Sequence, residues 1–276
     1  MSTPVSGPVT SYLTDQLTEH VFHDVTDGIA TITIDRPEKR NALTYPMLDA
    51  IRQAVVDDGA DPDVKAIIFT GTPGVFCAGT DLTALHDVEE DTDPEDRSSH
   101  TDGSQWFWYD APKPTIAAVD GACAGFGVEM ATMCDFRIAS TRARFSWIFV
   151  QRGLIPDGGA GTWLLPRIVG VQQAKRLMYS GEFIDAAEAE RLGFALEVVE
   201  PESLLETART FAHHVSSGSP FALSRLKELV NHSYAKPREQ HLHDNIAALT
   251  ECQLSDDHRE GVASFLEKRP AVFTGR

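Results

Sequence analysis

Two carboxylic acids in this 276-residue chain stand where a carboxyl group could carry protons. Asp157 follows the apolar and aromatic run FSWIFVQRGLIP (145–156) and lies just ahead of a glycine-rich turn, and Glu129 ends a second glycine-rich stretch. Apolar surroundings raise the pKa of an acid, which suits it to general acid–base catalysis near neutral pH. The alternatives are structural: Asp157 would cap a helix that begins near Gly158, and Glu129 would be favoured by the dipole at a helix N-terminus.

Two glycine-rich turns could supply a binding site for an anion: GTPGVFCAGTD (71–81) and GACAGFGVE (121–129). The first has Thr80-Asp81 where a phosphate-binding P-loop needs Lys-Ser/Thr, and the second has Met130 where a dinucleotide-binding fingerprint needs its third glycine. Backbone N–H groups of two such turns, converging on one point, can instead form an oxyanion hole. The alternative is that the glycines only permit tight turns.

The elements that would position these turns alternate between strands and helices. Strands are expected at 19–25, 29–35, 64–71, 114–121, 137–140 and 194–200, and the first two form a hairpin around TDG. A helix should begin after Thr44, and Asp185, Glu188 and Gly193 delimit another one by a capping box and a glycine stop. From Pro201 to about residue 267 the apolar periodicity is helical throughout. We therefore expect a loose arm over 1–17, an α/β core over 18–200 and a helical region over 201–276.

Composition excludes several classes of partner. The formal net charge of −17 argues against a nucleic acid or an anionic membrane as the main partner, and no apolar run is long enough to span a bilayer. Much of the acidity lies in 87–103, which we expect to be a solvated loop. The four cysteines lack metal-binding spacing and the first residues lack a secretion signal, so we expect reduced thiols, no metal and a cytoplasmic protein.

Several longer segments together resemble the enoyl-CoA hydratase/isomerase, or crotonase, superfamily. They are DRPEKRNAL (35–43), FTGTPGVFCAGTDL (69–82), PTIAAVDGACAGFGVEMATMCDFRIAS (114–140), GLIPDGGAGTWLLPRIVG (153–170), YSGEFIDAAEAERLGFALEVV (179–199) and EGVASFLEKRPAVF (260–273). The resemblance implies an α/β fold, a spiral of ββα units followed by a C-terminal helical trimerisation region. It also implies an acyl-CoA thioester substrate, assembly as a homotrimer or a dimer of trimers, and no cofactor, since coenzyme A is part of the substrate.

The resemblance also assigns site residues. The backbone N–H groups of Ala78 and Phe126 would form the oxyanion hole, and the Phe126 ring, where many relatives have glycine, would have to point away. Substrate-binding positions would be Lys39, Arg40, Ala42, Gly79, Asp81, Leu82, Gly125 and Phe149, with Lys268 near the 3′-phosphate of coenzyme A, often across a subunit boundary. We expect the side chains of Asp81 and Asp135 to be structural. For each cation, an ordinary exposed position is the alternative.

The carboxylates then suggest a reaction. The hydratases of the family use two glutamates; Glu129 matches the first, but Phe149 stands in place of the second. Asp157 matches the acid/base aspartate of the dienoyl-CoA isomerases and of the phenylacetate-pathway isomerases, which share GLxPD and LLPR. We therefore expect an enoyl-CoA isomerase with Asp157 as the principal acid/base and Glu129 as its partner. An enoyl-CoA hydratase, and a non-catalytic acyl-CoA-binding or scaffold protein, remain alternatives.

Overall fold

The structure, a computed structural model, describes residues 15–81, 83 and 103–276. Its centre is a seven-stranded sheet in the order β1-β2-β3-β4-β6-β8-β11. The strands are β1 (Asp15–Thr18), β2 (Val21–Thr26), β3 (Ile29–Ile34), β4 (Ala66–Gly71), β6 (Thr115–Val119), β8 (Phe136–Ser140) and β11 (Glu197–Val199). The pairs from β3 to β11 are parallel, and β1 and β2 form an antiparallel edge. Each longer strand predicted from the sequence is present in this sheet.

A second, four-stranded sheet was not predicted from the residue pattern. Its order is β10-β9-β7-β5, with β5 (Val75–Cys77), β7 (Ala122–Ala124), β9 (Arg144–Ser146) and β10 (Ile184–Asp185). The alternative that 71–81 and 121–129 are only tight turns is thus wrong, because β5 lies within the first stretch and β7 lies at the start of the second. Strands of two or three residues are too short to show a periodicity of two, so the pattern could not reveal them.

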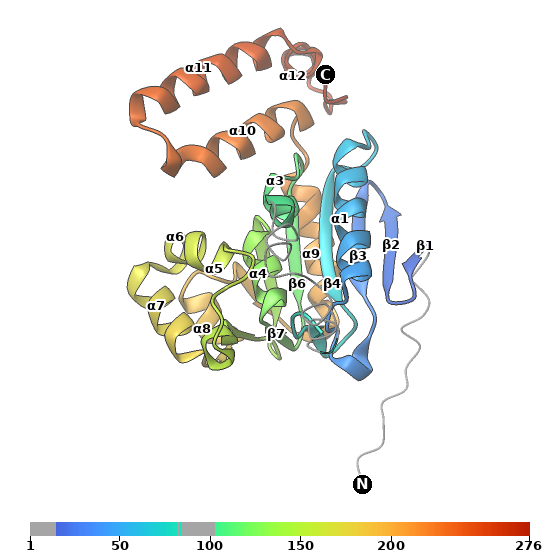
Figure 1. Ribbon diagram of the computed structural model, residues 1–276. Helices are drawn as coiled ribbons and strands as arrows, with labels where there is room; N and C mark the ends of the chain where they lie inside the picture. Colours follow the sequence, from blue (N-terminus) through green and yellow to red (C-terminus); the bar gives the residue numbers. More distant parts are fainter. Residues whose placement is uncertain (1–14, 82, 84–102) are drawn as a thin grey trace.

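Helices cover both faces of the large sheet (Figure 1). One face packs on α1 (Tyr45–Ala60), α3 (Phe107–Asp110) and α4 (Phe126–Met133), and the other face packs on α9 (Leu204–Val215). Within β4, Ile67 and Phe69 belong to the first core, and Ala66 and Ile68 belong to the second. Strands that are buried on both faces need apolar residues at every position, which explains the continuous apolar runs of the sequence.

Four short helices follow the turn at Asp157 and precede β11. They are α5 (Ala160–Trp163), α6 (Leu165–Val169), α7 (Val171–Ser180) and α8 (Ala186–Arg191). The predicted cap of α8 is confirmed, because the Asp185 carboxylate accepts a hydrogen bond from the Glu188 N–H at 2.9 Å.

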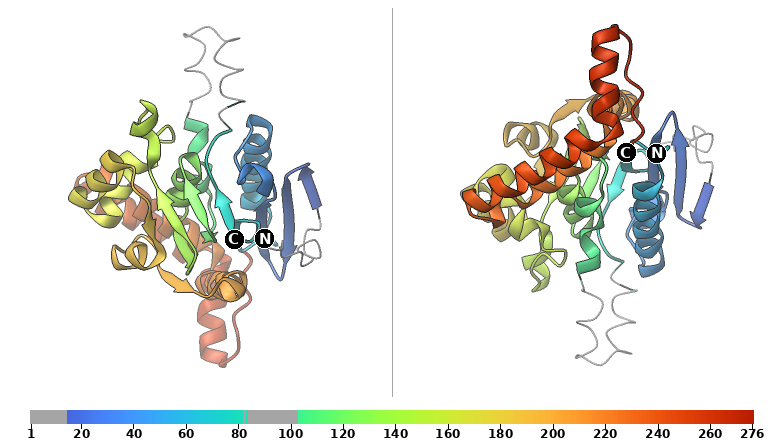
Figure 2. Two further views of the ribbon diagram at one scale, coloured as in Figure 1. Left: turned by 90° about the horizontal axis from the view of Figure 1, so that it is seen from below. Right: turned by 90° about the horizontal axis from the view of Figure 1, so that it is seen from above.

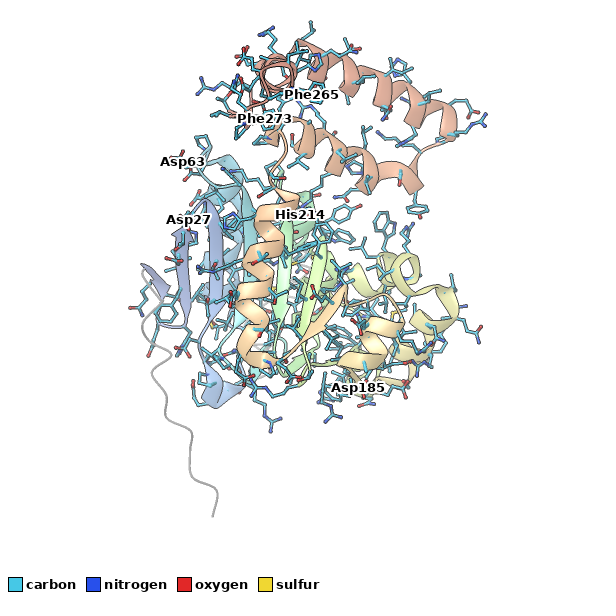
Figure 3. All side chains as sticks on the ribbon, turned by 180° about the vertical axis from the view of Figure 1, so that it is seen from behind. Asp27, Asp63, Asp185, His214, Phe265 and Phe273 are labelled. Atoms are coloured by element: carbon cyan, nitrogen blue, oxygen red, sulfur yellow. The ribbon has the colours of Figure 1, made fainter. Side chains whose placement is uncertain are left out.

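The last helices form an arm at one end of the core. They are α10 (Pro220–His232), α11 (Arg238–Leu254) and α12 (Asp256–Glu267), and Figure 2 shows them from above, lying across the core and reaching past it. In Figure 3, Phe265 and Phe273 lie together in this arm, at the opposite end of the molecule from Asp185. None of the residues of α10 and α11 is buried in the single chain.

Both predicted domain boundaries need correction. β1 begins at Asp15, so the loose arm cannot extend to residue 17, and residues 1–14 lie outside the described part of the chain. The helical region was expected to begin at residue 201, but α9 packs its Leu204, Ala208 and Ala212 on the large sheet and belongs to the core. The arm therefore starts with α10. Most of the acidic segment 87–103 also lies outside the described residues. Among the described helices, none is long and apolar enough to cross a membrane.

Candidate active site

The two glycine turns touch each other. A Cβ atom on Gly79 would lie 3.1 Å from the Phe126 nitrogen and 3.2 Å from the Ala124 carbonyl oxygen, and Gly79 has a φ of +107°. Only glycine tolerates both this conformation and this approach. The contact brings the backbone of Ala78 and the start of α4 side by side, as the oxyanion-hole prediction requires. Phe126 is the first residue of α4, and such an N–H has no partner within its own helix.

Polar contacts hold the first turn in place. The buried Asn41 accepts from the Arg36 N–H at 2.7 Å and donates to the Val75 carbonyl oxygen at 2.8 Å, which ties the turn around the 3₁₀ helix Pro37–Lys39 to β5. Arg36 also pairs with Asp81 at 2.8 Å, and its guanidinium holds the pKa of Asp81 below its usual value. The N–H of Ala78 donates to the Arg40 carbonyl oxygen at 3.1 Å, a partner that the sequence did not suggest.

Glu129 is held inside the protein on α4. Its side chain is 0% exposed, and its two carboxyl oxygens lie 2.9 Å and 3.1 Å from the Gly161 nitrogen, which donates to them. A Cβ on Gly161 would lie 2.6 Å from Glu129 Oε1 and 2.9 Å from the Trp147 ring, so a larger residue would have to displace these side chains. Burial raises the pKa of Glu129 to about 8, although the Gly161 hydrogen bond opposes the shift.

Asp157 lies nearby on an irregular turn and keeps part of its surface exposed to solvent. It accepts a hydrogen bond from the Gly158 N–H at 3.0 Å, and desolvation on its protein side raises its pKa. Asp157 does not cap the following helix. That helix, α5, begins at Ala160, and its N-cap position is occupied by Gly159, which has no side chain to form a capping bond. The charge of Asp157 contributes to the raised pKa of Glu129, so the two acids interact. The capping alternative is thus wrong.

Apolar groups pack between the two acids. If Gly158 carried a Cβ atom, that atom would lie 2.9 Å from the Met133 methyl, 3.2 Å from the Phe126 ring and 3.3 Å from the Glu129 Cβ. The Phe126 ring is buried in the core and lies against the turn that carries Asp157. Phe149, in the 3₁₀ helix Ile148–Arg152, is buried in the same core.

The remaining predicted site residues are only partly brought together. Lys39 and Arg40 are exposed beside the first turn and Ala42 is half-buried there, whereas Leu82 lies outside the described residues. Gly125 contacts the Ala78 and Gly79 backbone. Lys268 is the exposed C-cap of α12, in the arm, and not beside the glycine turns of its own chain. Asp135 is structural as expected, since it pairs with Lys227 at 2.8 Å and accepts from the Thr115 N–H.

Three residues of the site were missed by the sequence analysis. Asn41, Gly161 and Met133 act through close contacts between segments that are distant in the chain, and a local pattern does not show such contacts. One signal was available for Asn41: asparagine tolerates the left-handed conformation that it adopts here, with a φ of +54°.

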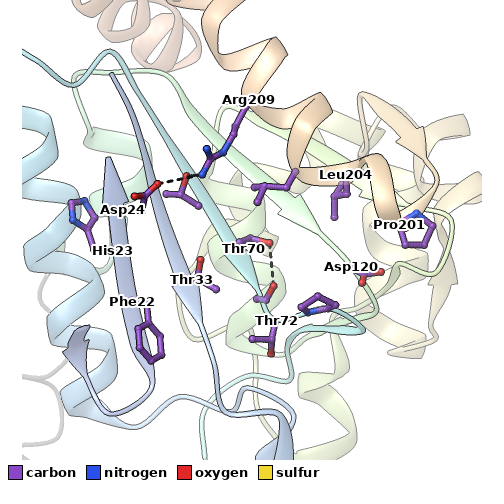
Figure 4. Close-up of a pocket in the computed structure, with 14 residues that line it drawn as sticks. Phe22, His23, Asp24, Thr33, Thr70, Thr72, Asp120, Pro201, Leu204 and Arg209 are labelled. Carbon is purple, nitrogen blue, oxygen red and sulfur yellow. Dashed lines mark hydrogen bonds and ion pairs between the residues drawn. The ribbon is translucent and has the colours of Figure 1, made fainter. Parts of the chain in front are cut away.

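A separate pocket lies on the other face of the large sheet and contains none of the predicted site residues (Figure 4). Threonines of β3 and β4 and leucines of α9 line its volume of about 110 Å³. Arg209 closes one side and pairs with Asp24 at 3.3 Å. Among the described residues, no cluster of His, Cys, Asp and Glu is arranged to hold a metal ion.

Comparisons with known proteins agree on one family. Residues 24–276 match the family model described as enoyl-CoA hydratase/isomerase. A protein of Mycobacterium leprae named as a probable enoyl-CoA hydratase is 37% identical, over 90% of this chain and 95% of its own length. The 1,2-epoxyphenylacetyl-CoA isomerase of Escherichia coli is 32% identical, over 94% of this chain and 99% of its own. The crystal structure of an enoyl-CoA hydratase from Bacillus anthracis superposes with a TM-score of 0.85 at 28% identity, covering 94% of this chain and 100% of that one.

Proposed function

The chain belongs to the enoyl-CoA hydratase/isomerase family and has the crotonase fold, and we propose that it shifts a carbon–carbon double bond of an enoyl-CoA thioester. The observation that carries this proposal is the pairing of a partly exposed acid, Asp157, with a sealed acid, Glu129, in apolar surroundings.

The thioester oxygen would bind between the two glycine turns. Its negative charge in the enolate would be stabilised by the N–H groups of Ala78 and Phe126, which lie at the contact of those turns. The Phe126 N–H belongs to the first residue of α4, and the positive end of a helix dipole favours a negative charge there. The Ala78 N–H donates to the Arg40 carbonyl oxygen, so the thioester must share or replace that partner.

Asp157 would carry the proton. As a carboxylate it removes a proton from the α carbon of a 3-enoyl thioester, and the electrons move to the thioester oxygen to form a dienolate. The same carboxyl group then returns the proton to the γ carbon, which leaves a 2-enoyl thioester. One carboxyl group suffices because the proton leaves and re-enters the same substrate.

Glu129 would remain neutral during this step. Its pKa of about 8 keeps it protonated at neutral pH, and a neutral neighbour does not oppose the ionisation of Asp157. The buried Phe149, at the position that the hydratases fill with glutamate, removes the second acid that water addition would use. Both features favour isomerisation over hydration.

Hydration of a 2-enoyl-CoA is the second candidate, because relatives such as the crotonyl-CoA hydratase of Syntrophomonas wolfei, 34% identical over 94% of this chain, bear that name. In that reaction Glu129, aided by Asp157, would activate the attacking water. Matched 2-enoyl- and 3-enoyl-CoA substrates distinguish the two reactions by the product formed. We expect double-bond migration and little hydroxyacyl product. A hydration rate typical of enzymes, about 1–10³ s⁻¹, would contradict the proposal.

The proposed reaction needs no cofactor, because coenzyme A is part of the substrate. We also propose that the chain assembles into a trimer or a dimer of trimers. The arm supports assembly, because apolar side chains of α11 such as Leu242, Ile246 and Leu249 are each more than half exposed in the single chain. Lys268 lies in this arm, so it can reach a coenzyme A phosphate only if the arm meets another subunit. Sedimentation should show a trimer or hexamer; a stable monomer would contradict this assembly.

A further inference from the structure

An apolar cavity of about 370 Å³ lies between the core and α10. This volume falls within the ~300–1,000 Å³ range of small-molecule sites. Its walls include Leu164 and Ile168 from the core, and its roof includes Leu223, Leu226 and Val230 of α10. Leu226 and Val230 are 56% and 59% exposed, so the single chain leaves much of this apolar surface uncovered.

Met133 separates this cavity from the candidate active site. Met133 lines the cavity, and its methyl group would lie 2.9 Å from a Cβ atom added to Gly158, the residue next to Asp157. That added Cβ atom would lie 3.3 Å from the Cβ of Glu129. The Met133 side chain therefore contacts both the cavity and the turn that carries Asp157. Methionine, with three rotatable bonds, is well suited to move aside.

A second, aromatic connection runs beside Met133. Tyr109 lines the cavity and stacks edge-on against Trp106 and Trp163, with ring centroids 5.2 Å and 5.9 Å away. Trp106 in turn lies 3.8 Å from the place of a Cβ on Gly159, two residues after Asp157. The cavity is thus continuous with the catalytic turn through apolar contacts on two sides.

Polar contacts at the rim fix the roof in place. Lys227 pairs with Asp135 at 2.8 Å, and the Asn231 side chain donates to the Tyr109 carbonyl oxygen at 3.0 Å. The Tyr109 hydroxyl donates to the Asn231 carbonyl oxygen. These bonds use the polar groups at the rim and leave an apolar interior, which suits an apolar occupant and disfavours a charged one.

We propose that this cavity receives the distal end of a long apolar acyl chain and that Met133 is the specificity-determining residue that divides it from the reacting carbons. The proposal rests on the proposed function, because it extends the same acyl site. Short acyl groups end before Met133, whereas longer ones displace it and enter the space beneath α10. The preferred substrates are therefore thioesters whose acyl chain is long enough to pass Met133.

Binding of saturated acyl-CoA thioesters from C4 to C12 tests this without requiring turnover. For the full chain, the dissociation constant should fall with length, by up to about fourfold for each buried methylene. Val230→Trp fills the cavity from its roof and should weaken C10 and C12 binding at least tenfold while changing C4 binding less than twofold. Met133→Ala removes the wall and should shift the preference further toward long chains.

Val171→Trp is the matched control, since Val171 is 60% exposed and lies on α7, whereas Val230 is 59% exposed. It should leave every length unchanged. Equal effects of Val230→Trp on C4 and C12, or no effect on either, would overturn the inference while leaving the proposed function intact. Loss of the oligomer in Val230→Trp would show that a second copy of the chain occupies the cavity, which also overturns it. Failure of the parent to bind any acyl-CoA would instead refute the proposed function.

Discussion

The helix that carries Glu129 and the turn that carries Asp157 place their carboxyl groups near each other, but the two groups differ in burial. Every residue of α4 is buried, and the Gly161 N–H fixes the carboxyl group of Glu129. The Asp157 turn follows an exposed segment, and the Asp157 carboxylate accepts a hydrogen bond from the N–H of the next residue. Burial raises the pKa of Glu129 to about 8, whereas Asp157, whose pKa is also raised by desolvation, keeps part of its surface in solvent.

This difference teaches how one site can hold two neighbouring carboxyl groups without both being charged. Two charged carboxylates so close together would repel each other, and this repulsion raises one of the two pKa values so that one carboxyl group keeps its proton. Sealing Glu129 removes that conflict. We therefore expect the proton transfer to depend mainly on Asp157, and the pH dependence of stability to depend mainly on Glu129.

Asp157→Asn should have the largest effect on this comparison. Asparagine keeps the size of the side chain and can still accept the Gly158 N–H, but it cannot take up a proton. Isomerisation should fall by about 10²–10⁴-fold. The free energy of unfolding at neutral pH should not decrease, because the raised pKa of Asp157 shows that its ionisation does not favour the folded state.

The matched control for Asp157→Asn is Glu129→Gln, which removes the other acid. We expect its loss of isomerisation to be clearly smaller. Equal losses in both variants would mean that Glu129 also carries an obligatory proton, and the division of roles between the two regions would fail. A folded and fully active Asp157→Asn enzyme would remove Asp157 from the mechanism.

Glu129→Gln should also change the pH dependence of stability. The carboxyl pKa is about 8 in the folded protein and about 4.5 in the unfolded chain, so the stabilisation is complete below pH 4.5. As pH rises from 4.5 to 8, the unfolded chain loses its proton first, and the parent loses stability relative to the glutamine variant. The difference should reach a few kcal/mol, at about 1.4 kcal/mol per pH unit, and stay constant above pH 8.

Urea unfolding of both proteins between pH 5 and pH 9 measures this difference directly. The contribution of Asp157 is present in both proteins and largely cancels. A difference that does not depend on pH would show that Glu129 is ionised in the folded state, contrary to its sealed position.

Much of this site could be predicted from the sequence because its parts are local. Asp157, Glu129 and both glycine turns stand within short motifs, and the long strands show their burial as apolar runs. The small sheet could not be predicted, since β5, β7 and β9 are three residues long and lie among glycines. The family resemblance implied ββα units, but the residues alone indicated only turns.

Contacts between distant segments account for the rest. The bond from Gly161 to Glu129 spans 32 residues and the Asn41 contact with Val75 spans 34, and no periodicity reports such pairs. The position of α9 was also missed, because a helix that covers a sheet and a helix of an exposed arm have the same apolar spacing. Their difference arises only when the sheet is in place.

Phe149→Glu tests the apolar side of the comparison. Phe149 is buried, and it stands where a hydratase would have its second glutamate. A glutamate there should restore a second acid and admit water, so we expect measurable water addition to a 2-enoyl-CoA and slower isomerisation. Burying the new carboxyl group should cost about 1–3 kcal/mol of the free energy of unfolding, which is measured first.

Phe149→Gln is the matched control, because it adds similar polarity without an acid. If the glutamine variant hydrates as well as the glutamate variant, water access alone limits hydration. If neither hydrates, the core around Phe149 does not decide between the two reactions, and Phe149 only packs.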